Sequence, residues 1–203
     1  MRRAARGGAL GRLLGGLYAG AGRPLRELRA SAAARRAGVG VPEPVAVRST
    51  RVRGPFRRFT IVSREVPDAA DLLSLVPGLS PARKRALTLR VADEMRRLHD
   101  AGVYHGDLTM KNILTSGEDV FIIDLDKAVL AGAPDDRRAV RNLSRLNRSV
   151  VKLFGSTGPV TRTDKLRFLR RYLRGRERLR ELAEVCGSGL WMHRLWWALS
   201  GQA

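Results

Sequence analysis

The spacing of apolar residues changes along the chain and predicts one helix, then strands, then a series of helices. The first helix is predicted over residues 23–37, because Pro24 suits a first helical turn and Gly38 suits a helix end. Its apolar stripe is predicted to consist of Leu25, Leu28 and Ala32. Two prolines in the VGVPEPV segment that follows prevent a helix there and predict an extended connection.

Apolar and β-branched residues next predict two strands, over 45–52 and 56–62, joined by a turn at residues 53–55. The segment 63–67 ends the second strand and leads into a short helix predicted over 70–76. This part of the chain therefore predicts a small strand-containing unit.

From Ser80 onward the pattern is mainly helical. Ser80 and Pro81 are typical of a helix start, and Gly102 is typical of its end. The buried stripe of this helix is predicted to be Leu87, Val91, Met95 and Leu98. Extended segments are predicted over 103–108, 113–115 and 120–124, a turn over 117–119, and helices over 135–154, 163–174, 176–186 and 188–199. The order predicts an α+β fold, with a partial N-terminal lobe at 1–66 and a helical C-terminal lobe at 67–203.

Composition narrows the function classes. The 203 residues hold 39 Lys and Arg against 19 Asp and Glu, a net charge of +20, and 34 of the basic residues are arginine. Such a surface favours nucleic acid, anionic lipid or a phosphorylated glycan, although an arginine-rich codon bias explains the same count. One cysteine excludes an internal disulfide and a cysteine-rich zinc cluster. No apolar run approaches the ~20 residues that cross a bilayer.

The first 22 residues are basic and contain a short apolar patch, which are traits of a targeting peptide. Arg12 and several glycines interrupt the patch, and it runs directly into the first predicted helix. We therefore expect this segment to be a loop and helix start that belong to the fold.

The stretch from Tyr104 to Leu114, YHGDLTMKNIL, carries the clearest chemistry together with the apolar strand that ends at Asp124. Phosphoryl transfer needs a carboxylate that accepts the proton of the attacking hydroxyl, and hard oxygen ligands for Mg²⁺. Asp107 follows an extended segment, and Asn112 comes five residues later. An antiparallel strand pair joined at Gly117 would bring Asp107 and Asp124 to the same end of a sheet. The alternative is a polar turn between two core strands.

This arrangement resembles the protein-kinase-like fold. The resemblance implies that Asp107 is the catalytic base, that Asn112 and Asp124 hold Mg²⁺, and that ATP is the phosphoryl donor. It also implies a structural role for His105, which would brace the loop through its ring nitrogens. Lys111 lies inside the same loop, where it could reach a transferred phosphate or a sugar phosphate, or could be a solvated lysine.

The resemblance narrows to the lipopolysaccharide core kinases, especially the 3-deoxy-D-manno-octulosonic acid (Kdo) kinase group, up to about residue 174. It is carried by the Asp124-Leu125-Asp126 sequence, by RNLSRLNRS at 141–149, and by Arg6-Gly7-Gly8 leading to RPLRE at 23–27. It implies a lipid A-linked glycan acceptor, peripheral attachment at the cytoplasmic face of the inner membrane, and no specific nucleic acid. We further expect the arginines at 138, 141, 145 and 148 to face this anionic glycolipid beside the Asp107 loop.

On the same resemblance, Glu27 matches the acid of the N-lobe helix, and Arg2 falls near the basic position of the third strand that pairs with it. The chain then begins at the third strand, so we expect the two earlier strands and their phosphate-covering loop to be missing. GGALGRLLGG follows that strand and is a weak candidate for a replacement loop. A late start codon and a degraded kinase both fit this expectation.

The remaining conspicuous residues have structural interpretations. Cys186 is expected to be buried and inert, His99 to cap the end of its helix, and His193 to have no site role. The tryptophans at 191, 196 and 197 fit helix packing, with an interfacial membrane anchor as the alternative.

Three function classes therefore stay open at this point. They are an ATP-dependent kinase for a sugar hydroxyl of the lipopolysaccharide inner core, on Kdo or heptose, an atypical serine/threonine protein kinase, and a non-catalytic arginine-rich binding module. The intact Asp107, Asn112 and Asp124 disfavour the third class, and Asp126 with segment 141–149 favours the first.

Overall fold

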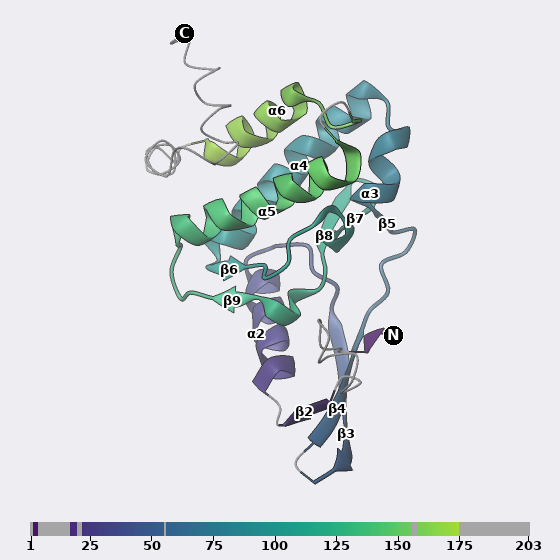
Figure 1. Ribbon diagram of the computed structural model, residues 1–203, viewed down its shortest axis with the longest axis vertical. Coiled ribbons are helices and arrows are strands. Elements are labelled where there is room, and N and C mark those ends of the chain that lie inside the picture. Colours follow the sequence, from purple (N-terminus) through teal and green to yellow (C-terminus); the bar gives the residue numbers. More distant parts are fainter. Residues whose placement is uncertain (1, 4–16, 20–21, 55, 156–157, 175–203) are drawn as a thin grey trace.

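The computed structural model describes residues 2–3, 17–19, 22–54, 56–155 and 158–174. A long β-hairpin and one helix occupy one end of the molecule, and three long helices lie together at the other (Figure 1). Short strands lie between them. The predicted mixture of helices and strands is confirmed.

The helices are α2 (Gly22–Arg36), α3 (Leu72–Leu75), α4 (Pro81–Asp100), α5 (Asp136–Phe154) and α6 (Arg162–Leu173). The strands are β1 (Arg2–Arg3), β2 (Leu17–Ala19), β3 (Pro44–Arg53), β4 (Phe56–Ser63), β5 (Ala70–Asp71), β6 (Val103–Tyr104), β7 (Ile113–Ser116), β8 (Asp119–Ile122) and β9 (Val129–Leu130). Three 3₁₀ turns are η1 (Val76–Gly78), η2 (Met110–Asn112) and η3 (Leu125–Lys127).

The N-terminal sheet is organised around β4. The β3 strand pairs antiparallel with β4 along one edge, in a register that places Val47 opposite Ile61. Both short N-terminal strands pair antiparallel with the other edge of β4, Arg2 opposite Ile61 and Leu17 opposite Arg58. A strand at Arg2 fits the position expected for it. The strand at Leu17 was not predicted, because three residues within a glycine-rich stretch give no readable alternation.

A second sheet has the order β5–β7–β8 and lies beneath the helices. Its β7–β8 hairpin is antiparallel with Ile113 opposite Ile122, so the residues just outside it, Asn112 and Ile123, adjoin each other. The backbone N–H of Ile123 donates to the carbonyl of Asn112 at 3.0 Å. The predicted antiparallel pair is therefore confirmed, and it brings Asn112 and Asp124 to one end of the sheet.

The loop after α2 connects the N-terminal helix to this second sheet. The N–H of Ile122 donates to the carbonyl of Gly40 at 2.7 Å, and Gly40 N–H donates to a buried Glu94 carboxylate at 3.2 Å. A Cβ at residue 40 would lie 2.0 Å from the Val120 carbonyl oxygen. Only glycine allows this close approach of the two backbones.

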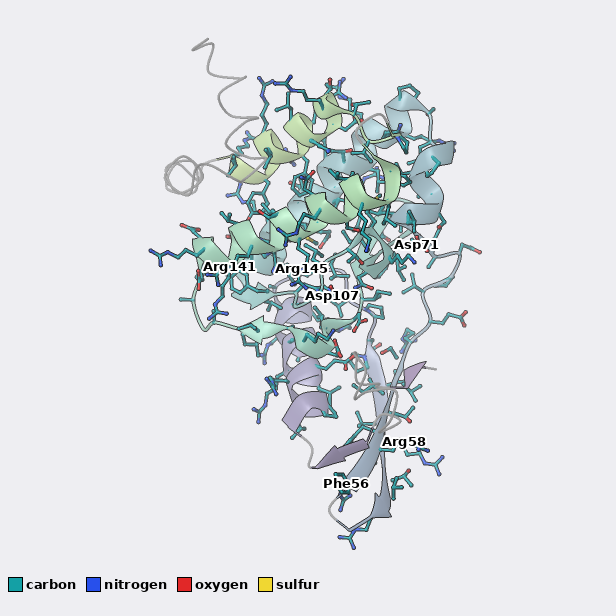
Figure 2. The ribbon with its side chains drawn as sticks, viewed as in Figure 1. Phe56, Arg58, Asp71, Asp107, Arg141 and Arg145 are labelled. Atoms are coloured by element: carbon teal, nitrogen blue, oxygen red, sulfur yellow. The ribbon has the colours of Figure 1, made fainter. Side chains whose placement is uncertain are left out.

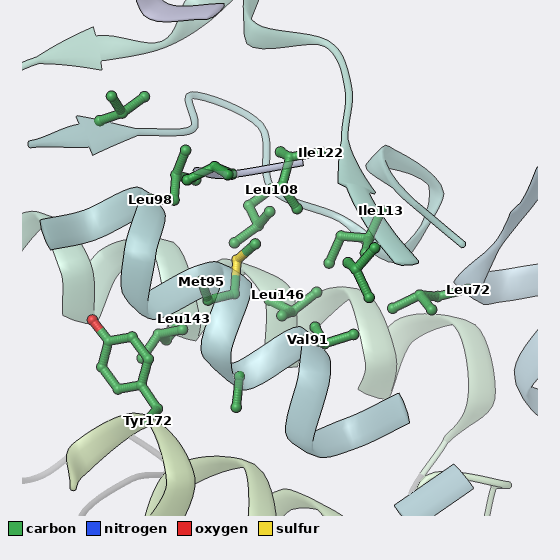
Figure 3. Close-up of a cluster of buried hydrophobic side chains, with 14 of the residues drawn as sticks. Leu72, Val91, Met95, Leu98, Leu108, Ile113, Ile122, Leu143, Leu146 and Tyr172 are labelled. Atoms are coloured by element: carbon green, nitrogen blue, oxygen red, sulfur yellow. The ribbon is translucent and has the colours of Figure 1, made fainter. Parts of the chain in front are cut away.

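The core lies where α4 packs against α5, α6 and the second sheet (Figure 3). The predicted α4 stripe is confirmed: Val91, Met95 and Leu98 are buried, and Leu87 packs half-buried against them. Buried partners from the other elements include Leu108, Ile113, Ile122, Leu143, Leu146 and Tyr172. This core fixes the segments that carry the candidate site, because each partner belongs to or adjoins one of them.

The predicted apolar stripe of α2 is wrong for two of its three residues, since only Leu28 is half-buried. Leu25 is 45% exposed and Ala32 is exposed, whereas Ala30 and Ala34 are fully buried. The buried face packs on η3, where small alanines let the helix come close to the turn. The helix ends as predicted, with Gly38 at a φ of 74° and its N–H donating to Arg35.

Two other predicted elements differ from the structure. Residues 70–71 form a strand that pairs with β7, so the helix predicted over 70–76 is restricted to α3 and η1. Only Val103 and Tyr104 of the segment predicted as extended over 103–108 pair as a strand. The remainder turns sharply because His105 bonds to the loop that follows it.

Among the residues that the structure describes, no helix combines the length and the apolar character needed to cross a membrane. The helices predicted over 176–186 and 188–199, Cys186, His193, the tryptophans and GGALGRLLGG lie outside the described residues.

We predict that Leu98→Ala lowers the free energy of unfolding by about 2–5 kcal/mol, because it leaves a cavity in a fully buried site. Leu25→Ala removes the same side chain from an exposed position on a helix and should change stability by no more than about 0.5 kcal/mol. Urea unfolding followed by circular dichroism measures both. Equal losses of unfolding free energy in the two variants would contradict the assignment of Leu98 to the core and of Leu25 to the surface.

Candidate active site

A buried histidine holds the candidate catalytic loop in place. The Nδ1 atom of His105 accepts a hydrogen bond from the backbone N–H of Asp107 at 2.9 Å. Its Nε2 atom lies 2.9 Å from the carbonyl of Ile123, the residue before Asp124. Because Nδ1 is an acceptor here, Nε2 must carry the ring proton and donate. One neutral imidazole thus joins the segments of both acids, as expected of a bracing residue.

The electrostatics of this imidazole depend on burial. His105 is 1% exposed, and burial lowers its pKa below 6.5. The Ile123 hydrogen bond and the nearby carboxylates of Asp124, Asp107 and Asp126 oppose the shift but are smaller. The ring therefore stays neutral at pH 7, which its two hydrogen bonds require.

A second buried side chain fixes the backbone of His105 itself. The Asn142 amide on α5 accepts from His105 N–H at 2.8 Å and donates to its carbonyl at 3.0 Å. The same Asn142 oxygen lies 3.4 Å from Nε2 of His99, whose Nδ1 lies 2.8 Å from the hydroxyl of Tyr172 on α6. His99 is therefore part of a buried network, and its predicted role as a helix cap is wrong.

Asn112 closes the loop from its other end. Its Nδ2 donates to the carbonyl of Asp107 at 2.8 Å, which leaves the side-chain oxygen as the group that can face a cation. Asn112 also adjoins Ile123, the residue before Asp124, at the end of the β7–β8 hairpin. The three residues predicted from their spacing thus come together around His105.

Asp124 has a left-handed backbone, with a φ of 66° and a ψ of 51°. This conformation costs an aspartate of order 1 kcal/mol or more, and residues held in this way are concentrated at functional sites. It directs the chain from β8 into η3, on which α2 packs. Gly106 lies directly on the end of the same turn, since a Cβ there would be 2.2 Å from the Lys127 carbonyl oxygen.

A cleft of about 510 Å³ lies between the N-terminal sheet, α2 and the second sheet. Glu27 and Ser31 line it from α2, Ile61 from β4, and Asp124 from the opposite side. The linker between the two sheets, residues 64–66, also lines it. From the sequence this linker is predicted only as the end of a strand, because nothing in its composition signals a ligand.

Of the predicted pair Glu27 and Arg2, the structure places Glu27 in this cleft together with Asp124. The backbone of Arg2 lies opposite Ile61, another residue of the cleft wall. Their ion pair stays a prediction, since the side chain of Arg2 is outside the described structure.

A second pocket, of about 480 Å³, contains Asp107. Arg145 on α5 donates from Nη1 to the Asp107 carboxylate at 3.1 Å and to the Gly106 carbonyl at 2.6 Å (Figure 2). Lys111 is exposed and also lines this pocket. The contact between Arg145 and Asp107 joins residues 38 apart in sequence, and the helical spacing predicted only that this side of the helix lies beside the Asp107 loop.

The predicted basic stripe of α5 divides into two parts. Arg138 forms an ion pair with Asp135, the N-cap of its own helix, at 2.9 Å. Arg145 and Arg148 line the Asp107 pocket, and Arg141 is exposed one turn before Arg145 (Figure 2). The expectation that this side of the helix adjoins the Asp107 loop is confirmed for Arg145 and Arg148.

Asp124 and Asn112 fit a divalent cation in their donor chemistry, since both offer oxygen at one end of a hairpin. Mg²⁺ is usually held by one or two such protein oxygens together with substrate phosphates and water. No group of three or more His, Cys, Asp or Glu side chains with metal-binding geometry occurs among the described residues.

The fold and the site define a kinase-like protein. The solved structure described as WaaP in complex with acyl carrier protein superimposes with a TM-score of 0.64 and 30% identity, covering 83% of this chain and 73% of that one. The predicted protein-kinase-like α+β fold is thereby confirmed. Residues 2–172 match the Lipopolysaccharide kinase (Kdo/WaaP) family, and the chain belongs to this family.

Two curated relatives bear on the alternatives. The 3-deoxy-D-manno-octulosonic acid kinase of Vibrio cholerae serotype O1 is 35% identical over 157 residues, which are 75% of this chain and 65% of that protein. The RIO-type serine/threonine-protein kinase Rio1 of Haloferax volcanii is 35% identical over 122 residues, 57% of this chain and 38% of that protein. The chain thus spans about 65% of the length of the first Kdo kinases it matches.

We predict that Gly106→Ala lowers the free energy of unfolding by about 1–3 kcal/mol, because the added methyl group would overlap the backbone of Lys127. Gly78→Ala is the matched control, since its Cβ meets no atom within 4 Å. Urea unfolding measures both variants. A Gly106→Ala protein as stable as Gly78→Ala would show that the loop does not rest on η3.

We also predict a pH dependence of stability that originates at His105. Its folded pKa is lowered by burial, so the unfolded chain binds more protons below about pH 6.5. The stabilisation is complete above pH 6.5 and is lost as the pH falls toward the lowered pKa, at up to about 1.4 kcal/mol per pH unit.

The variant His105→Gln should show a shallower slope of unfolding free energy between pH 6.5 and 5 than the wild type. Denaturant titrations at several pH values measure the slope. An unchanged slope would mean that His105 is not held neutral in the folded state.

Proposed function

We propose that the protein is an ATP-dependent kinase that phosphorylates a sugar hydroxyl of the lipopolysaccharide inner core, on Kdo–lipid A or a heptose. The observation that carries the proposal is the gathering of Asp107, Asn112 and Asp124 around the bridging imidazole of His105. Family membership and the similarity to Kdo kinases support the choice of substrate.

In this proposal Asp107 is the catalytic base. It accepts the proton of the acceptor hydroxyl while the hydroxyl oxygen bonds to the γ-phosphorus and the bond to the β–γ bridging oxygen breaks, releasing ADP. Arg145 holds one carboxylate oxygen of Asp107 at 3.1 Å, and the other oxygen is the one assigned to the hydroxyl. Lys111, on the same loop, stabilises negative charge on the transferred group.

The cleft between the two sheets is the proposed nucleotide site. Asp124 and Asn112 would hold Mg²⁺, which neutralises the phosphate charge. Glu27, which lines the cleft, is assigned to an ion pair with Arg2 that positions the phosphates. The linker at 64–66 is assigned to the adenine, because it connects the two sheets and lines the same cleft as Glu27 and Asp124.

For the acceptor, we propose a lipid A-linked glycan at the cytoplasmic face of the inner membrane, where the protein would bind peripherally. The exposed cations of α5 lie beside Asp107, and each well-placed basic side chain contributes about 1 kcal/mol of attraction to an anionic surface. This attraction is screened by salt, so activity should fall as ionic strength rises.

The protein-kinase alternative rests on the similarity to Rio1, which covers 57% of this chain. The two functions differ in acceptor and are separated by one assay. Kdo–lipid A and a casein-like protein are offered to the enzyme with radiolabelled ATP. Labelling of the glycolipid alone supports the proposal, and labelling of protein alone supports the alternative.

We predict that Asp107→Asn and Asp124→Asn each lower glycolipid phosphorylation about 100-fold or more, since one removes the proton acceptor and the other the metal ligand. Asp119→Asn makes the same change on the exposed turn at the other end of β8. It should retain activity within about twofold. Full activity of either site variant would refute the role given to that residue.

A further inference from the structure

The pocket that contains Asp107 has a strong excess of positive charge. Four cations and one carboxylate line it, a net charge of +4 − 1 = +3. The cations are Lys111, Arg145, Arg148 and Lys152. Among the described residues Arg145 is the only one of the four that makes an ion pair, and its partner is Asp107 itself.

The α5 helix determines the positions of three of these cations. Arg145, Arg148 and Lys152 recur at three- and four-residue intervals of α5, so they project from one side of the helix. Ser149 ties the helix to the catalytic loop, because its Oγ accepts from Met110 N–H at 3.3 Å. The hydroxyl accepts this bond through a lone pair, and its own hydrogen can in addition be donated to an anion.

This charge does not belong to the nucleotide cleft. The cleft is lined by Asp124, the pocket by Asp107, and the two share no lining residue. The cations therefore adjoin the position of the acceptor hydroxyl. Cations that outnumber the one carboxylate beside them favour the binding of an anion there.

We propose that this pocket is a subsite for an anionic group, a carboxylate or a phosphate, that the acceptor carries beside the hydroxyl to be phosphorylated. The proposal rests on the proposed function and deepens it, because it assigns to Arg148 and Lys152 the recognition of charge on the acceptor. Arg145 is a positioning residue, since it holds both the Gly106 carbonyl and the Asp107 carboxylate.

A specific subsite and a general attraction to the basic helix predict different effects of removing Arg141. Arg141 lies on the same side of α5, is exposed like Arg148 and Lys152, and does not line the pocket. Arg141→Gln therefore removes the same charge from the surface while leaving the subsite intact. It is the matched control for Arg148→Gln and Lys152→Gln.

The first experiment measures binding without ATP, by isothermal titration calorimetry with the methyl glycoside of Kdo and with its neutral carboxamide. We expect the wild type to bind the carboxylate form about tenfold more tightly. Arg148→Gln and Lys152→Gln should each reduce that preference about fivefold, and Arg141→Gln should leave it within about twofold.

A second comparison, of Kdo–lipid A with and without its lipid phosphates, identifies the source of the anion. The subsite binds a phosphate if the wild type prefers the phosphorylated lipid and shows no preference for the carboxylate. Arg148→Gln should then abolish the preference for the phosphorylated lipid. The subsite is overturned if neither pair of acceptors is distinguished by charge, or if Arg141→Gln removes as much preference as Arg148→Gln.

Turnover of the same acceptors separates this proposal from the proposed function. If both the proposed function and the subsite hold, Arg148→Gln raises the KM for the anionic acceptor about tenfold and changes kcat less than threefold. A wild type that binds the anionic acceptor preferentially but transfers no phosphoryl group would overturn the function and leave the subsite standing.

Discussion

The candidate site depends on one neutral imidazole with a partner on each nitrogen. His105 accepts from the backbone of Asp107 and donates to the carbonyl that precedes Asp124. A protonated ring would lose the first hydrogen bond, because Nδ1 would then carry a hydrogen. Burial keeps the pKa of His105 low enough to prevent this. The hydrogen bond that Asp107 donates to the ring therefore requires the neutral form of His105.

The surrounding fold holds that imidazole in place from several directions. Asn142 on α5 bonds both backbone groups of His105, and its neighbour His99 bonds to α6 through Tyr172. Gly106 lets the loop rest on η3, and the opposite side of η3 supports α2 with Glu27. This loop contributes Asp107 to one pocket, and the segment after β8 contributes Asp124 to the cleft that also contains Glu27. In the proposed reaction the acceptor hydroxyl and the γ-phosphate must meet where the two sites adjoin, because the attacking and leaving oxygens lie in line with the phosphorus.

Local patterns predicted the parts of this arrangement that are local. The spacing of Asp107, Asn112 and Asp124 with a turn at Gly117 sufficed to place them at one end of a hairpin. The apolar stripe of α4 was equally readable. The buried face of α2 could not be predicted in this way, because this helix packs closely through alanines and leaves Leu25 exposed. The partners that His99 and Asp107 have on α5 and α6 are 38 to 73 residues away, where no periodicity indicates them.

The most direct test of the site is a crystal structure with Mn²⁺ and a non-hydrolysable ATP analogue, in which anomalous scattering locates the metal. We predict Mn²⁺ at about 2.1 Å from a carboxylate oxygen of Asp124 and from the side-chain oxygen of Asn112. The γ-phosphate should face Asp107 from the cleft between the two sheets. A metal bound away from Asp124 and Asn112, or a γ-phosphate that faces away from Asp107, would contradict a single phosphoryl-transfer centre.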